Sequence, residues 1–201
     1  MSPFRMFRRP ALAASLIALS LAAVSPASAA PVKTGYARSG KLALYYEVHG
    51  SGGTPLVVLQ GSLCTVEICF GKMLPALAAR RQVILIDQQG HGRTRMGKNH
   101  PFTVTQMKRD SIPVMKKLGI RKADVLGYST GAAVALELAI TNPELVNKLV
   151  LLSGSYLATG MRKEIHEMLP KLTVEMMKQT PGTPRTRRWR RWTRSTSWSR
   201  R

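Results

Sequence analysis

The 201-residue sequence predicts an α/β fold in which a doubly wound, mostly parallel sheet carries helices on both faces. Two observations support this prediction. Short apolar runs without polar alternation recur along the chain, and such runs are typical of parallel strands buried on both faces. Segments with helical periodicity separate these runs, and the intervening loops are short. The length suits one domain of ordinary size.

Five segments have the pattern of strands. The first alternates apolar and polar residues and ends at a glycine-rich turn, whereas the others are short apolar runs such as LVVLQ and QVILI. These strands are predicted at residues 42–49, 56–60, 82–86, 123–127 and 148–152.

Three segments between the strands have helical periodicity, at residues 70–79, 104–118 and 130–142. Pro113 should kink or split the second helix, because proline removes a backbone hydrogen bond and clashes with the preceding turn. The third helix has four apolar residues predicted to share one face: Ala132, Ala133, Leu136 and Ile140. This alternation of strand and helix is that of α/β units.

The first 29 residues have the layout of a secretory signal peptide. Three arginines precede an uncharged run over residues 11–24, and the small residues of a cleavage site follow at 27–29. Cleavage after Ala29 predicts a secreted or periplasmic protein. An uncleaved anchor and a buried helix are the alternatives, although the apolar run is short for a membrane span.

The two cysteines, Cys64 and Cys69, lie close together in the sequence. Export would place them in an oxidising compartment, where they can form a disulfide. Two unpaired thiols are the alternative, and the sequence leaves the pairing open. Two cysteines are too few for a disulfide framework or for a zinc site of four thiolates.

The strongest chemical motif is Gly-Tyr-Ser-Thr-Gly at residues 127–131, between a predicted strand and a predicted helix. In this context G-x-S-x-G forms a sharp turn with the serine at its apex. The small residues at the two ends of the motif let strand and helix approach closely, so the Ser129 hydroxyl projects from the sheet edge. The Thr130 amide faces the same point and can donate to an oxyanion, helped by the helix dipole. The alternative is a glycine-rich turn with a capping serine.

Two further strand ends carry glycine turns at the edge where open parallel sheets place their catalytic residues. One is Q-G-S at residues 60–62, and the other is D-Q-Q-G-H-G-R-T at residues 87–94. His91 lies between the two glycines of the second turn. A structural role in the turn is the preferred interpretation of His91, and a catalytic base is the alternative.

These motifs, together with N-P-E-L-V-N-K-L-V-L-L-S at residues 142–153, resemble the α/β-hydrolase fold superfamily. The resemblance covers residues 36–180 and is greatest to bacterial esterases and lipases with a D-x-x-G-H-G turn. It implies that Ser129 is the nucleophile and that the amides of Thr130 and Ser62 form the oxyanion hole. A plain glycine turn is the alternative at Ser62. The resemblance also implies a helical lid, which would begin with helices at 161–170 and 172–179.

The sequence departs from the family pattern in two ways. Gln60 stands where family members mostly carry a histidine, which affects the geometry of the loop. In the family, an acid and then a histidine follow the nucleophile along the chain. Here no strand is predicted after Ser153, and the downstream acids and histidine fall in lid-like helices: Glu164, His166, Glu167 and Glu175. We therefore expect a fold that lacks its last strands and a chain whose hydrolysis is impaired.

The last 21 residues, 181–201, have a different composition from the rest. They hold eight arginines, all three tryptophans and no acid, and so account for much of the net charge of +21. Two interpretations remain open: a basic tail that binds nucleic acid or an anionic membrane, or out-of-frame translation of G+C-rich codons. The expected organisation is thus a signal peptide at 1–29, a hydrolase core at 30–160, the start of a lid at 161–180 and a basic tail at 181–201.

The sequence as a whole predicts a secreted serine hydrolase that cleaves an ester or similar acyl bond of a small-molecule substrate. No cofactor or metal is expected, because no G-x-G-x-x-G follows a strand and neither a P-loop nor an H-E-x-x-H motif occurs. The alternatives are a non-catalytic fragment and a basic protein that binds membranes or nucleic acid through its tail. The identity of the substrate is not predicted.

Overall fold

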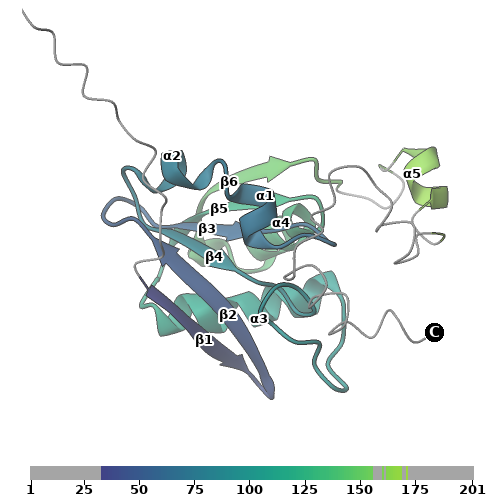
Figure 1. Cartoon of the computed structure of the whole chain (residues 1–201), viewed down its shortest axis with the longest axis horizontal. Helices are drawn as coiled ribbons and strands as arrows, with labels where there is room; N and C mark the ends of the chain where they lie inside the picture. The colour runs from purple at the N-terminus through teal and green to yellow at the C-terminus, as the bar shows by residue number, and fades with distance from the viewer. Residues whose placement is uncertain (1–32, 156–159, 161, 169–170, 172–201) are drawn as a thin grey trace, which may run out of the picture.

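The computed structural model describes residues 33–155, 160, 162–168 and 171 of the chain (Figure 1). The predicted signal peptide at 1–29 and the basic tail at 181–201 lie outside these residues. The predicted core at 30–160 and the predicted lid at 161–180 are described in part. Within the described part, no helix is both long enough and apolar enough to cross a bilayer.

A six-stranded sheet forms the centre of the fold. Its strands are β1 (Lys33–Ser39), β2 (Leu42–His49), β3 (Leu56–Leu59), β4 (Val83–Ile86), β5 (Ala123–Tyr128) and β6 (Val146–Leu152). They lie in the order β1-β2-β4-β3-β5-β6. Strand β2 is antiparallel to both β1 and β4, whereas β4, β3, β5 and β6 pair in parallel. The predicted α/β class with a mostly parallel sheet is confirmed.

The sequence does not predict β1. This strand reads KTGYARS, and only Ala37 among its residues is buried, so it has no apolar run to mark it. It forms because it pairs with β2 along its whole length, from Lys33 opposite Val48 to Ser39 opposite Leu42. Backbone hydrogen bonds to an adjacent buried strand can thus recruit a polar segment to a sheet edge.

The helices are α1 (Val66–Phe70), α2 (Leu74–Ala78), α3 (Val104–Lys117), α4 (Thr130–Thr141) and α5 (Lys163–Met168), with a short 3-10 helix, η1, at Pro143–Leu145. The single helix predicted at 70–79 is wrong, because two short helices occupy this region. Thr65 caps the first, since its Oγ1 accepts a hydrogen bond from the Ile68 amide at 3.2 Å. A turn that begins at Gly71 separates the two helices, and Pro75 lies in the first turn of the second.

Pro113 was expected to kink or to split the helix that contains it. Helix α3 is not split at this residue. It runs from the capping residue Thr103 to Lys117 with the proline inside it. The buried face of the helix holds Met107, Val114 and Met115 in the core, and this packing offsets the loss of one backbone hydrogen bond.

The helices cover both faces of the sheet, as a doubly wound fold requires (Figure 1). On one face, α1 and α2 pack Val66, Phe70 and Leu74 against side chains of β3 and β4. On the other face, α3 and α4 pack against alternate residues of the same strands, including Val57 and Ile84. Because β3 and β4 are buried on both faces, they read as continuous apolar runs.

The face predicted for α4 is only partly right. Ala132 is buried, but Ile140 is 61% exposed, and the buried set is shifted around the helix to Val134, Ala135 and Leu138. The helix is apolar around most of its circumference, so periodicity alone does not define which side packs on the sheet. Its neighbour β6 is an edge strand, on which Val150 and Leu151 are about two-fifths exposed.

The predicted lid is described only at its start. Helix α5 (Lys163–Met168) overlaps the first predicted lid helix at 161–170 and contains Glu164, His166 and Glu167. The second predicted lid helix at 172–179, with Glu175, lies outside the described residues.

Candidate active site

Ser129 lies at an abrupt bend between β5 and α4. Its backbone has φ 53° and ψ −119°, a conformation that non-glycine residues adopt rarely and that tertiary contacts must hold in place. The Ser129 amide donates to the Leu152 carbonyl at 2.9 Å, and its carbonyl accepts from the Ala132 amide at 2.9 Å. The residue is half-buried. The bend is thus fixed by hydrogen bonds on both sides.

The two glycines of the motif allow this bend to pack. A Cβ on Gly127 would contact the Gly131 carbonyl and would lie 2.6 Å from Ala132 Cα. A Cβ on Gly131 would contact the Leu59 carbonyl and would lie 2.6 Å from the carbonyl oxygen of Gln60. Both positions face backbone atoms that cannot rotate away. The spacing of the glycines around Ser129 therefore follows from the close approach of α4 to β5 and β3.

The loop after β3 meets the bend directly. A Cβ on Gly61 would lie 2.9 Å from Ser129 Cβ, so only glycine fits between the two segments. The next residue, Ser62, has its Oγ 2.8 Å from Thr130 Oγ1. The structure therefore brings the three predicted site residues, Ser129, Thr130 and Ser62, to one place at the carboxyl ends of β3 and β5.

Thr130 is the first residue of the 12-residue helix α4. Amides in the first turn of a helix have no acceptor within the helix, and the helix dipole makes this end electropositive. Backbone amide donors at such a helix end can stabilise the negative charge that develops on a carbonyl oxygen while a nearby hydroxyl attacks the carbonyl carbon.

Gln60 takes a structural position at the start of this loop. It is buried, and in the amide orientation that satisfies both partners its nitrogen donates to the Ile86 carbonyl at 2.5 Å. Its oxygen then accepts from the Gln88 amide at 2.8 Å. The side chain thereby ties the loop after β3 to the loop after β4. Sequence reasoning identified Gln60 only as a departure from the family pattern, because these partners are distant along the chain.

His91 holds the same loop from the other side. Its Nε2 accepts a hydrogen bond from the Leu63 amide at 3.2 Å, and its Nδ1 donates to the Gln89 carbonyl at 2.9 Å. Burial lowers the pKa of His91, which favours this neutral form. With both ring nitrogens engaged in this way, the geometry matches the structural role preferred from the sequence.

Two other imidazole rings are held in contacts remote from Ser129. His49 is buried in β2, and its Nε2 lies 3.0 Å from Glu47 Oε2. His100 has its Nε2 2.9 Å from Oδ2 of Asp110. Within the described residues, therefore, neither of these histidines is placed as a general base for the serine.

The structure contains a disulfide between Cys64 and Cys69, which settles the pairing that the sequence leaves open. The bond joins the end of the loop that carries Ser62 to helix α1, and Cys69 packs against the core on that face. Together with the Leu63–His91 hydrogen bond, it anchors the loop just beyond the predicted oxyanion donor.

Asp87 lies beneath the turn that contains His91. Its Oδ2 accepts a hydrogen bond from the Arg93 amide at 2.8 Å, and the Arg93 guanidinium donates to Glu47 at 2.8 Å. Burial raises the pKa of Asp87 to about 6, and the contacts with Arg93 oppose only part of this increase.

The raised pKa predicts a pH-dependent difference in stability between the wild type and Asp87→Asn. The folded chain binds the Asp87 proton more tightly than the unfolded chain, in which the pKa returns to its ordinary value of 3.8. The wild type therefore loses stability as the pH rises through this window. Between about pH 8 and about pH 5, the free energy of unfolding of the wild type should increase by about 1.4 kcal/mol relative to the variant. Urea unfolding at both pH values measures this change, and an unchanged difference would contradict the assignment.

Residues 54–188 match the family model described as the alpha/beta hydrolase fold. Among curated proteins, the chain is similar to RutD of Azorhizobium caulinodans, which is named as a candidate carbamate hydrolase. The two are 36% identical over 138 residues, which cover 68% of this chain and 51% of RutD. The chain spans about half the length of the curated relatives it matches first.

Solved structures are similar in the same region. The epoxide hydrolase CorEH superposes with a TM-score of 0.61 and 25% identity, over 69% of this chain and 50% of CorEH. A hydrolase from Pseudomonas aeruginosa PA01 superposes with a TM-score of 0.60 and 21% identity, over 82% of this chain and 66% of that protein. At 21% identity, the similarity to the second protein shows only a shared fold.

Proposed function

Since the chain belongs to the α/β-hydrolase fold family, we propose that it hydrolyses an ester or similar acyl bond of a small molecule, with Ser129 as the nucleophile. The observation that carries this proposal is the strained bend at Ser129, with φ 53°, against the amide end of α4. Strain of this kind persists where the surrounding structure over-determines it, and it is concentrated at active sites.

In the proposed reaction, Ser129 Oγ forms a bond to the carbonyl carbon and its proton passes to a base. The amides of Thr130 and Ser62 donate to the oxygen that becomes negative. Collapse of this intermediate breaks the bond to the leaving group, which takes up a proton and departs. Water then hydrolyses the acyl-enzyme and restores the serine.

The proposal includes impaired turnover by the 201-residue polypeptide. Among the histidines whose side chains the structure describes, the ring of His49 contacts Glu47, that of His91 contacts the Leu63 and Gln89 backbone, and that of His100 contacts Asp110. An acylation step without a positioned base retains only the part of catalysis that the oxyanion donors and binding provide.

The substrate class of the proposal is esters and carbamates, in which the bond that breaks joins the carbonyl carbon to an alcohol or amine leaving group. The name of RutD concerns a carbamate, and carbamates and esters share the carbonyl carbon that a serine attacks. An amide-lined oxyanion site does not distinguish the two, because its donors contact the carbonyl oxygen alone.

The test measures release of nitrophenol from nitrophenyl butyrate and a nitrophenyl carbamate, with and without free imidazole. Without imidazole, we expect a rate near that of the protein-free reaction. With imidazole as an external base, the protein should accelerate release above the imidazole-only rate. No acceleration by the protein in imidazole would contradict the acyl-hydrolase proposal, whereas fast turnover without imidazole would contradict the proposed impairment alone.

We also propose export of the chain, on the strength of the arginine-rich start, the apolar run and the small residues at 27–29. Amino-terminal sequencing of protein recovered from the periplasm or medium of a bacterial host should begin at Ala30. An intact amino terminus on protein recovered from the cytoplasm would contradict this proposal.

A further inference from the structure

The loop between β3 and α1, which carries the predicted oxyanion donor Ser62, contains no buried side chain in its middle. None of the residues from Ser62 to Thr65 is buried, whereas Gly61 before them and Val66 after them are buried. Packing therefore fixes the two ends of the loop, and the position of its middle depends on hydrogen bonds and covalent links.

Leu63, in the middle of this loop, has a left-handed backbone conformation. Its φ is 63°, which residues other than glycine, asparagine and aspartate adopt rarely. An unrestrained chain would relax to a negative φ, and rotation about the N–Cα bond of Leu63 would change the position of Ser62 relative to α1. The loop keeps its shape because contacts on both sides of Leu63 restrain it.

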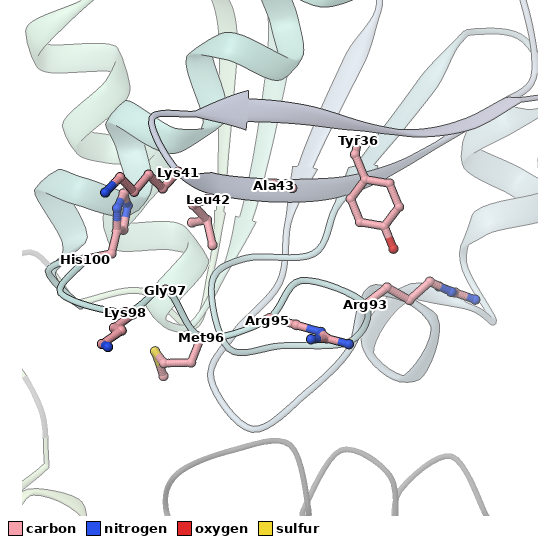
Figure 2. Close-up of a pocket in the computed structure, with 10 residues that line it drawn as sticks. All are labelled: Tyr36, Lys41, Leu42, Ala43, Arg93, Arg95, Met96, Gly97, Lys98 and His100. Carbon is pink, nitrogen blue, oxygen red and sulfur yellow. The ribbon is translucent and has the colours of Figure 1, made fainter.

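The first restraint acts on the amide of Leu63, which donates to His91 Nε2 at 3.2 Å. The turn that carries His91 is itself held by the neighbouring sheet, since Thr94 Oγ1 accepts from the buried Tyr45 amide of β2 at 2.8 Å. Arg93 and the residues that follow it lie alongside the β1–β2 hairpin (Figure 2). His91 is therefore a fixed anchor for the loop.

The second restraint is the disulfide between Cys64 and Cys69, which acts on the residue directly after Leu63. The Cα atoms of the two cysteines lie 6.1 Å apart, within the range that a disulfide spans. Cys69 belongs to α1, which packs the buried side chains of Val66 and Phe70 into the core. The bond thus fixes the carboxyl side of Leu63 to a helix that is itself fixed to the sheet.

These restraints lie next to the nucleophile. A Cβ on Gly61 would lie 2.9 Å from Ser129 Cβ, and Ser62 Oγ lies 2.8 Å from Thr130 Oγ1. An oxyanion donor acts only within hydrogen-bond distance of the oxygen that becomes negative, so a small displacement of the loop removes its contribution. The conformation of Leu63 therefore decides whether the Ser62 amide can serve the site.

We propose that the Cys64–Cys69 disulfide positions the Ser62 amide for the oxyanion, so that reduction of this bond lowers the reactivity of Ser129. The inference rests on the proposed acyl hydrolysis at Ser129 and adds redox control to it. A dithiol supplies two electrons and two protons, becomes a disulfide itself, and leaves Cys64 and Cys69 as two thiols. Leu63 then relaxes and the Ser62 amide leaves its position. In the oxidising compartment that the proposed export implies, the bond persists and the site stays complete.

The measurement is fluorophosphonate labelling of Ser129 in imidazole, on the oxidised chain and on chain reduced with dithiothreitol, which is then removed under nitrogen. A series of probe concentrations separates the maximal labelling rate from the concentration that gives half of it. Reduction should lower the maximal rate at least about tenfold, because one of two oxyanion donors is displaced. The half-saturating concentration should change less than about twofold, because the donor acts mainly on the transition state. Reoxidation should restore the rate.

Two variants serve as controls. Cys64→Ser/Cys69→Ser should label at the rate of the reduced wild type, with or without prior treatment with dithiothreitol. Ile120→Val shortens a core side chain in the turn after α3, so it lowers stability without touching the loop. It should label at the rate of the oxidised wild type, and circular dichroism should show that every form is folded.

The outcomes separate this inference from the proposed function. Equal maximal rates for the oxidised and reduced chains, or a change in the half-saturating concentration alone, would overturn the inference and leave Ser129 as the nucleophile. A reduced chain that unfolds, or an equal loss of rate in Ile120→Val, would show that the bond acts only on stability and would also overturn it. An oxidised wild type that stays unlabelled at Ser129 would contradict the proposed function itself.

Discussion

Replacing Ser129 with alanine should remove the imidazole-dependent ester cleavage of the chain, with a decrease of at least about 1,000-fold in the protein-catalysed rate. The variant keeps the backbone donors but has no oxygen to form the acyl-enzyme. The measurement is the initial rate of nitrophenol release in imidazole, after subtraction of the protein-free rate.

The matched control is Ser51→Ala, since Ser51 lies exposed in the loop between β2 and β3. This control should keep the wild-type rate. If Ser129→Ala cleaved the ester as fast as Ser51→Ala, the reaction would belong to another nucleophile and the proposed role of Ser129 would be wrong.

Gly131→Val should cause the largest loss of stability among the substitutions considered for this chain. The Cβ of the valine would meet the backbone carbonyls of Leu59 and Gln60, and these atoms cannot move without displacing β3 and the loop that follows it. We expect a decrease of at least about 3 kcal/mol in the free energy of unfolding, because the overpacking is against backbone rather than a flexible side chain.

Ala133→Val is the control for this substitution, because it adds a branched residue to the same helix at a half-buried position. Its cost should stay below about 1 kcal/mol, which covers the lower helix propensity of valine. Urea unfolding followed by circular dichroism compares the two variants. Equal and small losses would show that α4 does not approach β3 as closely as the structure has it.

The central strands of the sheet could be predicted because each has a recognisable apolar pattern in the local sequence. β3 and β4 are buried on both faces, so each is a continuous apolar run. β1 carries no such signal, since it is a polar edge strand that depends on its pairing with β2. The helix predicted at 70–79 fails for a similar reason: the apolar pattern does not encode the turn that separates α1 from α2.

Only part of the candidate site could be predicted from local sequence. The bend at Ser129 follows from five consecutive residues, because the steric demand of a strand that turns into a helix is local. The contact between Ser62 and Thr130 joins residues 68 apart, and only the family resemblance pointed to Ser62. The bridging role of Gln60 depends on long-range packing, which no short pattern in the sequence reports.

The most direct test of the central claim, that Ser129 is a nucleophile presented at a strained bend, is covalent labelling with a fluorophosphonate in the presence of imidazole. Mass spectrometry of the digested protein should find one adduct, on the peptide that contains Ser129. The adduct should be absent from Ser129→Ala and unchanged in Ser51→Ala. An adduct that persists in Ser129→Ala, or a wild-type chain that stays unlabelled at Ser129, would contradict the claim.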